Sequence, residues 1–413
     1  MLKSIIRKEI LLNLLSYKYS IVTALTTILI LASILMMYRD YGLARENYET
    51  LARLSSKSGA AVIPPTPLSI FVKGLEDDLC RSYEGGPVSI EASRKQQSVN
   101  KVFRLFTTPD LLYIIKIVLS LCAMLFAFDM VCGEKEAGTL RQSLSSSLGR
   151  PILIAGKWIG GFTSFILTFF MPVLLGTIFV TLSPVVDMNA QDWTKLGLFL
   201  LSSVIYLAVF FSLGLLISCL THQASSALVV SLSVWTLLVF LIPNLGIILA
   251  RELVEIPTVQ QLEVARTYYG VRLYLAERRM DSMDRSEFDR LVDRVRAESD
   301  QLTEDYRNRF NRLLAVSRNI TRMSPAAAFT FLATDIMGTG MLEERKLKRA
   351  VLQYRDVLWN WDEEGARPAF SYQRCSVQGV LGQGGLSNGL ILVLFNVLFF
   401  SGAYVTFLRY DAR

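Results

Sequence analysis

Six separate runs of apolar residues are the feature that most restricts how this chain can fold. Each has about the length that a helix needs to cross a bilayer, roughly 20 residues for about 30 Å of hydrocarbon. A backbone in lipid has no water to satisfy its N–H and C=O groups, so such runs must be helical. A β-barrel would instead show many short segments of alternating hydrophobicity, which are absent here. The six runs are 20–37, 111–131, 158–182, 196–220, 225–249 and 389–408.

The composition agrees with a chain that lies largely in a membrane. The sequence is 52% hydrophobic and only 19% charged, whereas soluble domains carry about 25% charged residues. The expected fold class is an all-α integral membrane protein with six transmembrane helices. The net charge of +7 suits loops that lie against anionic lipid. It does not indicate nucleic-acid binding, because no base-stacking aromatic residues lie among the basic clusters.

The apolar runs divide the chain into spans and polar inserts. The first run could be a signal peptide, but no small-residue cleavage site follows Met37, so we expect a retained anchor. The predicted parts are 1–37 (an N-terminal interfacial helix and the first span), 38–110 (a first insert), 111–250 (spans two to five, with a charged segment at 132–150), 251–388 (a second insert) and 389–413 (the last span and a tail).

The second insert is predicted to be largely helical. Its stretch Val259–Met323 is rich in Glu, Arg, Leu and Ala and contains few helix breakers. Ser324 followed by Pro325 is a good pair for the N-cap and first turn of a further helix. The glycines at 338 and 340 end that helix, and another runs from Met341 towards Trp361. The charges on these helices are expected to form a solvated face.

Basic residues near the ends of the spans predict the orientation. With six spans, the N-terminal stretch, the loop after the second span and the tail lie on one side of the membrane. These three segments carry ten basic residues against four acidic ones, and the loop after the third span is net acidic. Both termini are therefore expected in the cytoplasm of a bacterial inner membrane, and both inserts are expected to be extracytoplasmic.

Two of the five cysteines fall in the predicted inserts. Cys80 lies in the first insert and Cys375 in the second, and the extracytoplasmic space is oxidising. One hypothesis is a disulfide that joins the two inserts. The alternative is two buried free thiols.

The segment between the second and third spans is the most informative. Asp129–Gly161 reads DMVCGEKEAGTLRQSLSSSLGRPILIAGKWIGG. Gly133 lets the chain turn after the span, and the next three residues form a charged cluster at the membrane surface. Leu140, Leu144 and Leu148 then fall on one face of a short helix, and Arg150-Pro151 begins the next span. We expect a short helix along the membrane surface that could transmit a push from a soluble partner.

This pattern resembles the first cytoplasmic loop of ABC type-2 exporter permeases, in which G-E-x-E-x-G-T-L, a Ser/Leu run, an Arg and G-K-x-x-G recur. The matching positions are Gly133, Glu134, Glu136, Gly138, Thr139, Leu140, Arg150, Gly156, Lys157 and Gly160. The family's proline in the Ser/Leu run is absent before Gly149. The resemblance implies a coupling helix that docks on an ATPase subunit. The implied coupling residues are Gly133, Glu134, Lys135, Glu136, Gly138, Thr139, Leu140, Arg141, Leu144 and Arg150.

The resemblance extends to three other segments. Leu2–Tyr17 is similar to the family's N-terminal interfacial helix. Pro67–Leu75 and Ser324–Gly340 look like external segments of a subgroup of these permeases with large extracytoplasmic inserts. The resemblance also implies that ATP and Mg²⁺ are bound by the partner ATPase and that this chain holds no cofactor of its own.

The chain is predicted to lack an ATPase site. A P-loop requires G-x-x-x-x-G-K-[ST], because backbone N–H groups cradle the phosphates and the hydroxyl holds magnesium. The nearest approach is Gly149…Gly156-Lys157-Trp158, in which six residues separate the glycines and Trp replaces the hydroxyl residue. His222 is the only histidine, so neither a histidine metal cluster nor a Ser-His-Asp triad is expected.

Single residues inside the spans suggest further roles. Lys116 lies within the second span, where a charge is costly; it either snorkels to the outer surface or lines a substrate path. Pro172 and Pro243 are predicted to kink the third and fifth spans, as hinges or as simple packing kinks. Gly156 and Gly160 form a G-x-x-x-G that is typical of close helix packing.

These observations predict the permease subunit of an ATP-binding cassette exporter that moves an apolar or amphipathic substrate. The predicted partners are ABC ATPase subunits, a second permease or a second copy of this chain, the lipid bilayer and a candidate extracytoplasmic protein. A secondary transporter or channel is disfavoured, because the spans contain almost no ionisable residues near the midplane. The alternative from another class is a membrane-anchored adaptor or sensor whose helical external insert binds a partner.

Overall fold

The computed structural model describes residues 2–58, 61–79, 83–85, 90–92, 109–145, 149–255, 259–278, 285–359, 368 and 370–410. Within these residues, six helical segments are long and apolar enough to cross a membrane, and each overlaps one of the predicted runs. The protein is therefore an all-α, multi-pass membrane protein, as predicted. The six segments are Tyr17–Arg53, Leu111–Glu136, Arg150–Thr181, Ala190–Leu220, Ala224–Leu253 and Val377–Arg409.

The chain forms two compact units. Unit 1 comprises Met1–Gly85, Glu91–Phe240 and Ser324–Arg413, and unit 2 comprises Gly86–Ile90 and Leu241–Met323. The described elements in chain order are α1 (Leu2–Leu14), α2 (Tyr17–Ser58), η1 (Pro67–Ile70), α3 (Glu76–Leu79), β1 (Tyr83–Gly85), β2 (Ile90–Ala92), α5 (Leu111–Tyr113), η3 (Ile114–Leu119), α6 (Ser120–Ala127), α7 (Cys132–Glu136), α8 (Thr139–Ser145), α9 (Arg150–Thr181), α10 (Ala190–Leu220), α11 (Ala224–Thr236), η4 (Leu237–Leu241), α12 (Ile242–Leu253), α13 (Val259–Arg278), α14 (Arg285–Thr321), α15 (Pro325–Met337), α16 (Met341–Trp359), α17 (Val377–Val380), η6 (Leu381–Gly385) and α18 (Leu386–Arg409).

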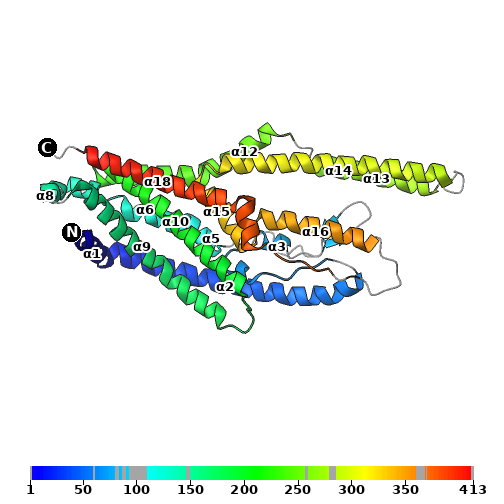
Figure 1. Cartoon of the computed structure of the whole chain (residues 1–413), viewed down its shortest axis with the longest axis horizontal. Helices are drawn as coiled ribbons and strands as arrows, with labels where there is room; N and C mark the ends of the chain where they lie inside the picture. Colours follow the sequence, from blue (N-terminus) through cyan, green and yellow to red (C-terminus); the bar gives the residue numbers. More distant parts are fainter. Residues whose placement is uncertain are drawn as a thin grey trace. The chain divides into compact units, whose positions relative to one another are not determined.

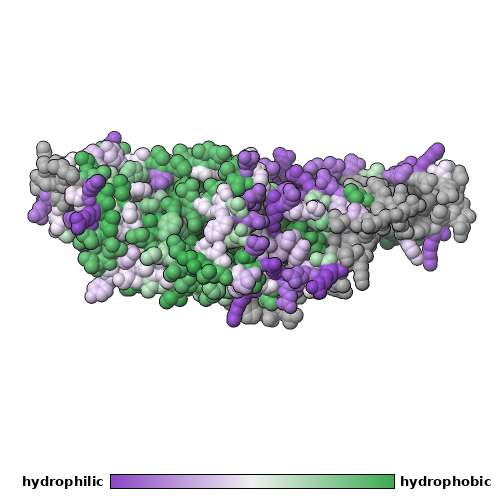
Figure 2. Space-filling view, turned by 60° about the horizontal axis from the view of Figure 1, so that its bottom comes forward, coloured by the Kyte–Doolittle hydropathy of each residue, from purple (hydrophilic) through white to green (hydrophobic). Residues whose placement is uncertain are grey.

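Unit 1 has two distinct ends. One end, which we call the coupling end, holds α1, α8 and the last turn of α18 (Figure 1). The opposite end of this unit, the distal end, holds α3 and α16. Between the two ends the surface of the unit is largely hydrophobic, with hydrophilic residues on either side (Figure 2). Exposed residues of α9 such as Leu174, Leu175 and Ile178 contribute to this surface, which suits contact with lipid.

At the coupling end, α1 packs directly against the first half of α9. Gly156 and Gly160 make this close approach feasible. A Cβ atom at 156 would lie 2.7 Å from Ile5 Cγ2, and one at 160 would lie 2.7 Å from Glu9 Cβ and 3.0 Å from the Ile6 carbonyl oxygen. The prediction that this G-x-x-x-G is a packing motif is confirmed.

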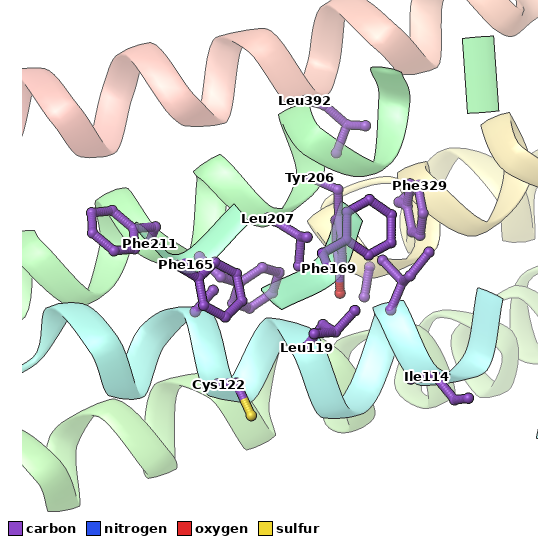
Figure 3. Close-up of a cluster of buried hydrophobic side chains, with 14 of the residues drawn as sticks. Ile114, Leu119, Cys122, Phe165, Phe169, Tyr206, Leu207, Phe211, Phe329 and Leu392 are labelled. Atoms are coloured by element: carbon purple, nitrogen blue, oxygen red, sulfur yellow. The ribbon is translucent and has the colours of Figure 1, made fainter. Parts of the chain in front are cut away.

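The core of unit 1 is aromatic and joins helices that are far apart in the sequence. Tyr206 of α10 is fully buried and stacks on Phe329 of α15, with ring centroids 4.3 Å apart. Phe165 and Phe169 of α9 belong to the same cluster (Figure 3). The Tyr206 hydroxyl donates to the carbonyl oxygen of Lys116, 2.8 Å away, so the phenol is satisfied inside the apolar core.

Helix α15 shows where the predicted domain boundaries differ from the structure. The predicted N-cap is confirmed: the Ser324 hydroxyl accepts from the backbone N–H groups of Ala326 and Ala327. The helix ends at Gly338, whose φ of 71° is left-handed. However, α15 belongs to unit 1 and is buried beside α10 and α18, whereas the sequence placed it in a separate polar insert. Its 13 residues are too few to span a bilayer, so the sequence did not indicate that it packs against the spanning helices α10 and α18.

Two other helix boundaries also differ from the predictions, and the fifth span is not uniformly α-helical. Helix α2 continues to Ser58, well into the stretch assigned to the first insert. The last helix begins at Val377, ahead of the predicted Gly389, and has a break with Gly384 at φ 117°. The fifth span changes from α-helix to a π-helical turn, η4, before α12.

Unit 2 consists mainly of a helical hairpin, formed by α13 and α14, together with α12. The Arg272 guanidinium of α13 pairs with the Glu298 carboxylate of α14 at 3.1 Å. Gly246 of α12 packs on α14, because a Cβ atom there would lie 2.6 Å from Thr321 Cγ2. The helical character that was predicted for the second insert is confirmed for these segments.

Candidate coupling site

The predicted coupling segment contains two short helices. Helix α7 ends at Glu136 and α8 begins at Thr139. Gly138 between them has φ 70°, a conformation that glycine adopts without strain. Gly133, which was predicted to form the turn, lies inside α7. The short helix that was predicted around Leu140 corresponds to α8, whereas the charged cluster forms an additional helix, α7, in place of the turn expected at Gly133.

Glu134 of α7 is part of a buried ion cluster. The ammonium group of Lys157 on α9 lies 2.7 Å from a carboxylate oxygen of Glu134 and 3.1 Å from one of Glu9 on α1. The Lys157 side chain is only 4% exposed. We call Glu9, Lys157 and Glu134 the coupling triad. It connects three helices of unit 1 through one shared cation.

The next two charged residues of α7 contact other spans. The Lys135 ammonium donates to the carbonyl oxygens of Cys219 and Thr221, 2.5 and 3.0 Å away, at the end of α10. These carbonyls belong to the last turn of a helix, where a cation is favourable. A carboxylate oxygen of Glu136 accepts from the backbone N–H of Ala224, 3.0 Å away, at the start of α11. Each charge of the sequence Glu134-Lys135-Glu136 therefore holds a different helix.

The remaining spans are tied to the same region. Arg150 at the start of α9 donates to the carbonyl oxygens of Leu408 and Tyr410, 2.8 and 3.2 Å away, at the end of α18. Lys18 of α2 pairs with Asp129, which precedes α7. Ser218 of α10 accepts from the backbone N–H groups of Val131 and Cys132 at 2.9 and 3.0 Å. Helix α7 and its flanks thus contact α2, α9, α10 and α11, and Arg150 links α9 to the end of α18.

Helix α8, in contrast, presents polar residues outward. Leu140 is buried, with 1% exposure, so this part of the predicted apolar face is confirmed. Thr139, Arg141 and Gln142 are exposed. The side chain of Leu144, and Leu148 as a whole, lie outside the described residues. The site therefore consists of an anchored part, α7, and an exposed part, α8.

Comparison with known proteins identifies the kind of protein that carries this arrangement. The family described as "ABC-2 family transporter protein" matches residues 4–412, nearly the whole chain. The chain belongs to the ABC-2 transporter family. A stretch of 125 residues is also 30% identical to the "Probable ABC transporter permease protein NosY" of Stutzerimonas stutzeri. That match covers 30% of this chain and 44% of the relative, so the alignment spans less than half the relative's length.

Two members of the coupling triad of this ABC-2 protein were missed as site residues. The sequence marks Glu9 as an acidic residue near the terminus and Lys157 as a basic residue in a G-K-x-x-G pattern, and neither pattern indicates an ion pair. A signal was present for Lys157, because it is a charge among the apolar residues of a membrane-spanning helix. Such charges need an oppositely charged partner. Their close contact follows from the packing of α1 on Gly156 and Gly160.

The other predicted site residues lie away from the coupling end or inside single helices. The Lys116 ammonium lies 5.7 Å from the centroid of the Tyr113 ring. Tyr113 is nearer than Lys116 to the distal end of the same span, so this position of the ammonium favours snorkelling. Pro172 is buried within a continuous α9. Pro243 lies in the first turn of α12. A substrate path at Lys116 and hinges at the two prolines stay predictions.

The predicted disulfide concerns the distal end of unit 1. Cys375 is a buried free thiol, and its backbone N–H donates to a carboxylate oxygen of Glu343 at 3.1 Å. Burial, followed by the nearby Glu343 carboxylate, raises the pKa of this thiol to about 11. The expected partner, Cys80, lies outside the described residues. The pairing stays a prediction.

Proposed function

We propose that this chain is the membrane-spanning permease subunit of an ATP-binding cassette exporter. In this role α8 docks on a separate ATPase subunit, which binds ATP and Mg²⁺ and hydrolyses the nucleotide. Closure of the ATPase pushes on α7, and the spans shift to move an apolar or amphipathic substrate outward. Membership of the ABC-2 family and the similarity to a probable ABC permease support this proposal.

The observation that carries the proposal is that α7 is anchored to several spans whereas α8 is exposed. Glu134, Lys135 and Glu136 are consecutive, yet they hold α9 with α1, the end of α10 and the start of α11. A displacement of α7 must therefore act on several spans at once. Helix α8 follows α7 after two residues and leaves Thr139, Arg141 and Gln142 exposed. An external partner can reach α8 without breaking the contacts of α7.

The same proposal includes the orientation of the chain in the membrane and the subunits of the complex. The coupling end lies in the cytoplasm, so both termini are cytoplasmic and the inserts are extracytoplasmic in a bacterial inner membrane. The excess of basic residues in the segments at this end supports that orientation. The working complex contains two ATPase subunits and two permeases, the second permease being another copy of this chain or a related one.

Affinity purification of the full chain from native membranes tests the first part of the proposal. Mass spectrometry should find an ABC ATPase in the purified complex, and reconstituted complexes should hydrolyse ATP. A native preparation with no ATPase and no response to nucleotide would contradict the proposal. Labelling that placed α8 on the external face of intact cells would also contradict it.

Two variants separate docking from transmission. Arg141→Glu changes an exposed side chain of α8, so it should weaken co-purification of the ATPase. Glu134→Gln weakens the coupling triad, so it should leave the complex assembled but reduce the response of hydrolysis to substrate. Arg312→Glu, an equal charge change at an exposed position of α14, is the matched control and should do neither. If both coupling variants behave like the control, the site is assigned wrongly.

One observation favours the alternative function, a membrane-anchored adaptor or sensor. Helix α13 of unit 2 carries exposed apolar side chains, among them Val264, Tyr268, Val271 and Leu275, at spacings of four, three and four residues. Such a stripe is typical of a helix that packs against another helix. The adaptor hypothesis predicts no dependence on an ATPase, so the same purification and hydrolysis measurements separate the two functions.

A further inference from the structure

A cavity of about 650 Å³ lies at the distal end of unit 1. Its walls come from three separate stretches: the proline-rich segment 64–67, the start of α10, and residues 373–376 ahead of α17. The volume is in the range of small-molecule sites. None of its lining residues belongs to the coupling site, which lies at the other end of the unit.

Lys195 of α10 lines this cavity and is the only lining residue with a buried charge that has no close counterion among the described residues. It is 4% exposed. No described residue hydrogen-bonds to its ammonium or pairs with it within 4.0 Å. A mostly buried lysine that lines a cavity without a close counterion in the protein favours a ligand that supplies negative charge.

The neighbouring charged groups are already engaged with other atoms. Glu343, Asp192 and Arg374 act on Lys195 through space. The Glu343 carboxylate accepts from the Tyr372 hydroxyl at 2.7 Å and from the Cys375 N–H at 3.1 Å. Asp192 accepts from the Asn189 N–H at 3.1 Å in the capping box of α10. These carboxylates therefore reduce the local positive potential without directly contacting the ammonium.

The cavity also contains groups that favour an anion. Arg374 lines it, although its guanidinium is paired with Glu76 at 2.8 Å. The amide side chains of Gln191 and Gln373 supply hydrogen-bond donors. The start of α10 adds the partial positive charge of a helix N-terminus. These features complement the buried Lys195 and do not by themselves define the site.

We propose that this cavity binds a phosphate-type oxyanion, and that the source is the headgroup of an anionic phospholipid. The position of the cavity along the membrane-spanning helix α10 supports the lipid source. It lies at the first turn of a membrane-spanning helix, where Trp193 is 43% exposed, and tryptophan is enriched at the membrane interface. The ammonium of Lys195 pairs with the phosphate, and the amides of Gln191 and Gln373 donate to its oxygens. This proposal is independent of ATPase coupling, since it concerns the permease chain alone.

Binding measurements on the purified full chain test the proposal. The probes are nanodiscs or vesicles of phosphatidylglycerol, matched phosphatidylcholine membranes, and inorganic phosphate in detergent. Native mass spectrometry should show phosphatidylglycerol retained in preference to phosphatidylcholine. Lys195→Gln should weaken that retention by roughly tenfold or more, whereas Lys195→Arg should largely preserve it. Lys348→Gln, at an exposed lysine of α16, is the matched control.

The lipid and phosphate measurements distinguish the two sources of the oxyanion. Retention of phosphatidylglycerol without measurable binding of inorganic phosphate supports the headgroup. Inorganic phosphate that binds in a Lys195-dependent manner, with no lipid preference, would keep the oxyanion site but overturn the lipid source. No Lys195-dependent binding of either probe would overturn the proposal.

Thermal unfolding without added ligand provides a second, independent measurement. If the ammonium is buried without a counterion, Lys195→Met removes an uncompensated charge and should raise the unfolding temperature in delipidated detergent. Added phosphatidylglycerol should stabilise the unchanged protein and not this variant. A lower unfolding temperature for Lys195→Met in the absence of lipid would show that Glu343 already compensates Lys195, and would overturn the proposal even if binding were not measured.

Discussion

The two ends of unit 1 are both held by buried ion pairs, but the pairs are built differently. At the coupling end, one Lys157 ammonium is shared by the carboxylates of Glu9 and Glu134. At the distal end, one Arg374 guanidinium uses both terminal nitrogens. It donates to both oxygens of Glu76 and to the carbonyl oxygens of Gly338 and Pro64, all within 3.1 Å.

This difference suggests which end can move. The planar guanidinium fork of Arg374 fixes direction as well as distance, and its carboxylate partner is fully paired. In the coupling triad the charges do not balance, and Oε2 of Glu134 is buried without a hydrogen-bond partner among the described residues. A lysine is a point charge on a flexible stem. We therefore expect the Arg374–Glu76 contact to hold the distal end rigidly. The contacts of Lys157 with Glu9 and Glu134 at the coupling end can rearrange more easily.

The largest expected effect comes from removing the shared cation. Lys157→Met leaves the carboxylates of Glu9 and Glu134 together at the packed contact of α1, α7 and α9. Breaking a buried ion pair from one side costs about 3–5 kcal/mol, so the free energy of unfolding should fall by that order. Thermal unfolding of the purified protein in detergent measures the change.

The triple variant Glu9→Gln, Lys157→Met and Glu134→Gln is the control for this effect. It removes all three charges, and such replacements are often close to neutral for stability. It should therefore recover most of the lost stability while still lacking coupled ATP hydrolysis. If the triple variant is as unstable as the single one, the cost arises from packing and the triad has no special electrostatic role.

The second prediction concerns the Arg374–Glu76 ion pair at the distal end. Arg374→Lys keeps the charge, but one ammonium cannot reach Glu76, Gly338 and Pro64 at the same time. The unpaired carbonyls and the weaker ion pair should cost about 1–3 kcal/mol. Thermal unfolding should show the loss. In complexes reconstituted from the folded variant and the proposed ATPase partner, ATP hydrolysis should respond to substrate as before. Loss of coupling at unchanged stability would reverse the assignment of the two ends.

Some of the helices and contacts at the two ends could be predicted from the sequence, and others could not. The spans could be predicted because a run of about 20 apolar residues has few alternatives in a bilayer. Helix α15 was predicted as a helix, but its packing against the spans was not, because its 13 residues are too short to span and polar stretches flank it. The sequence predicted Glu134 as a coupling residue, but it did not predict the contacts with Lys157 and Glu9. Lys157 is 23 residues from Glu134 and lies on α9, and Glu9 lies on α1.

The missing information was the relative position of the helices. Lys157 and Glu9 are 148 residues apart, so their pairing depends on α1 lying against α9. The small residues Gly156 and Gly160 indicated a close contact but not which helix makes it. The Glu76–Arg374 pair is separated by 298 residues and has no local pattern at all. Long-range charge pairs of this kind follow from packing and not from sequence spacing.

A smaller effect is expected at the contact between α7 and α11. Glu136→Gln removes the charge that accepts from the Ala224 N–H at a helix start but keeps an amide oxygen. Glu136 is exposed, and a cap of this kind contributes about 0.5–1 kcal/mol. Stability should change little, whereas the response of ATP hydrolysis to substrate should fall measurably. An unchanged response would limit transmission to Glu134 and Lys135.

The smallest effect is chemical and probes the distal end without destabilising it. Because burial and the Glu343 carboxylate raise the pKa of Cys375 to about 11, its thiol is protonated at neutral pH and the thiolate is rare. Alkylation by iodoacetamide should therefore be slow at pH 7.5 and accelerate about tenfold per pH unit towards pH 10. Peptide mass spectrometry of the folded protein measures the rate. Glu343→Gln removes the nearby negative charge and should make the reaction faster at each pH. If Cys375 is instead paired with Cys80, no alkylation will occur at any pH until a reductant is added, and the two cysteines will be recovered in one cross-linked peptide.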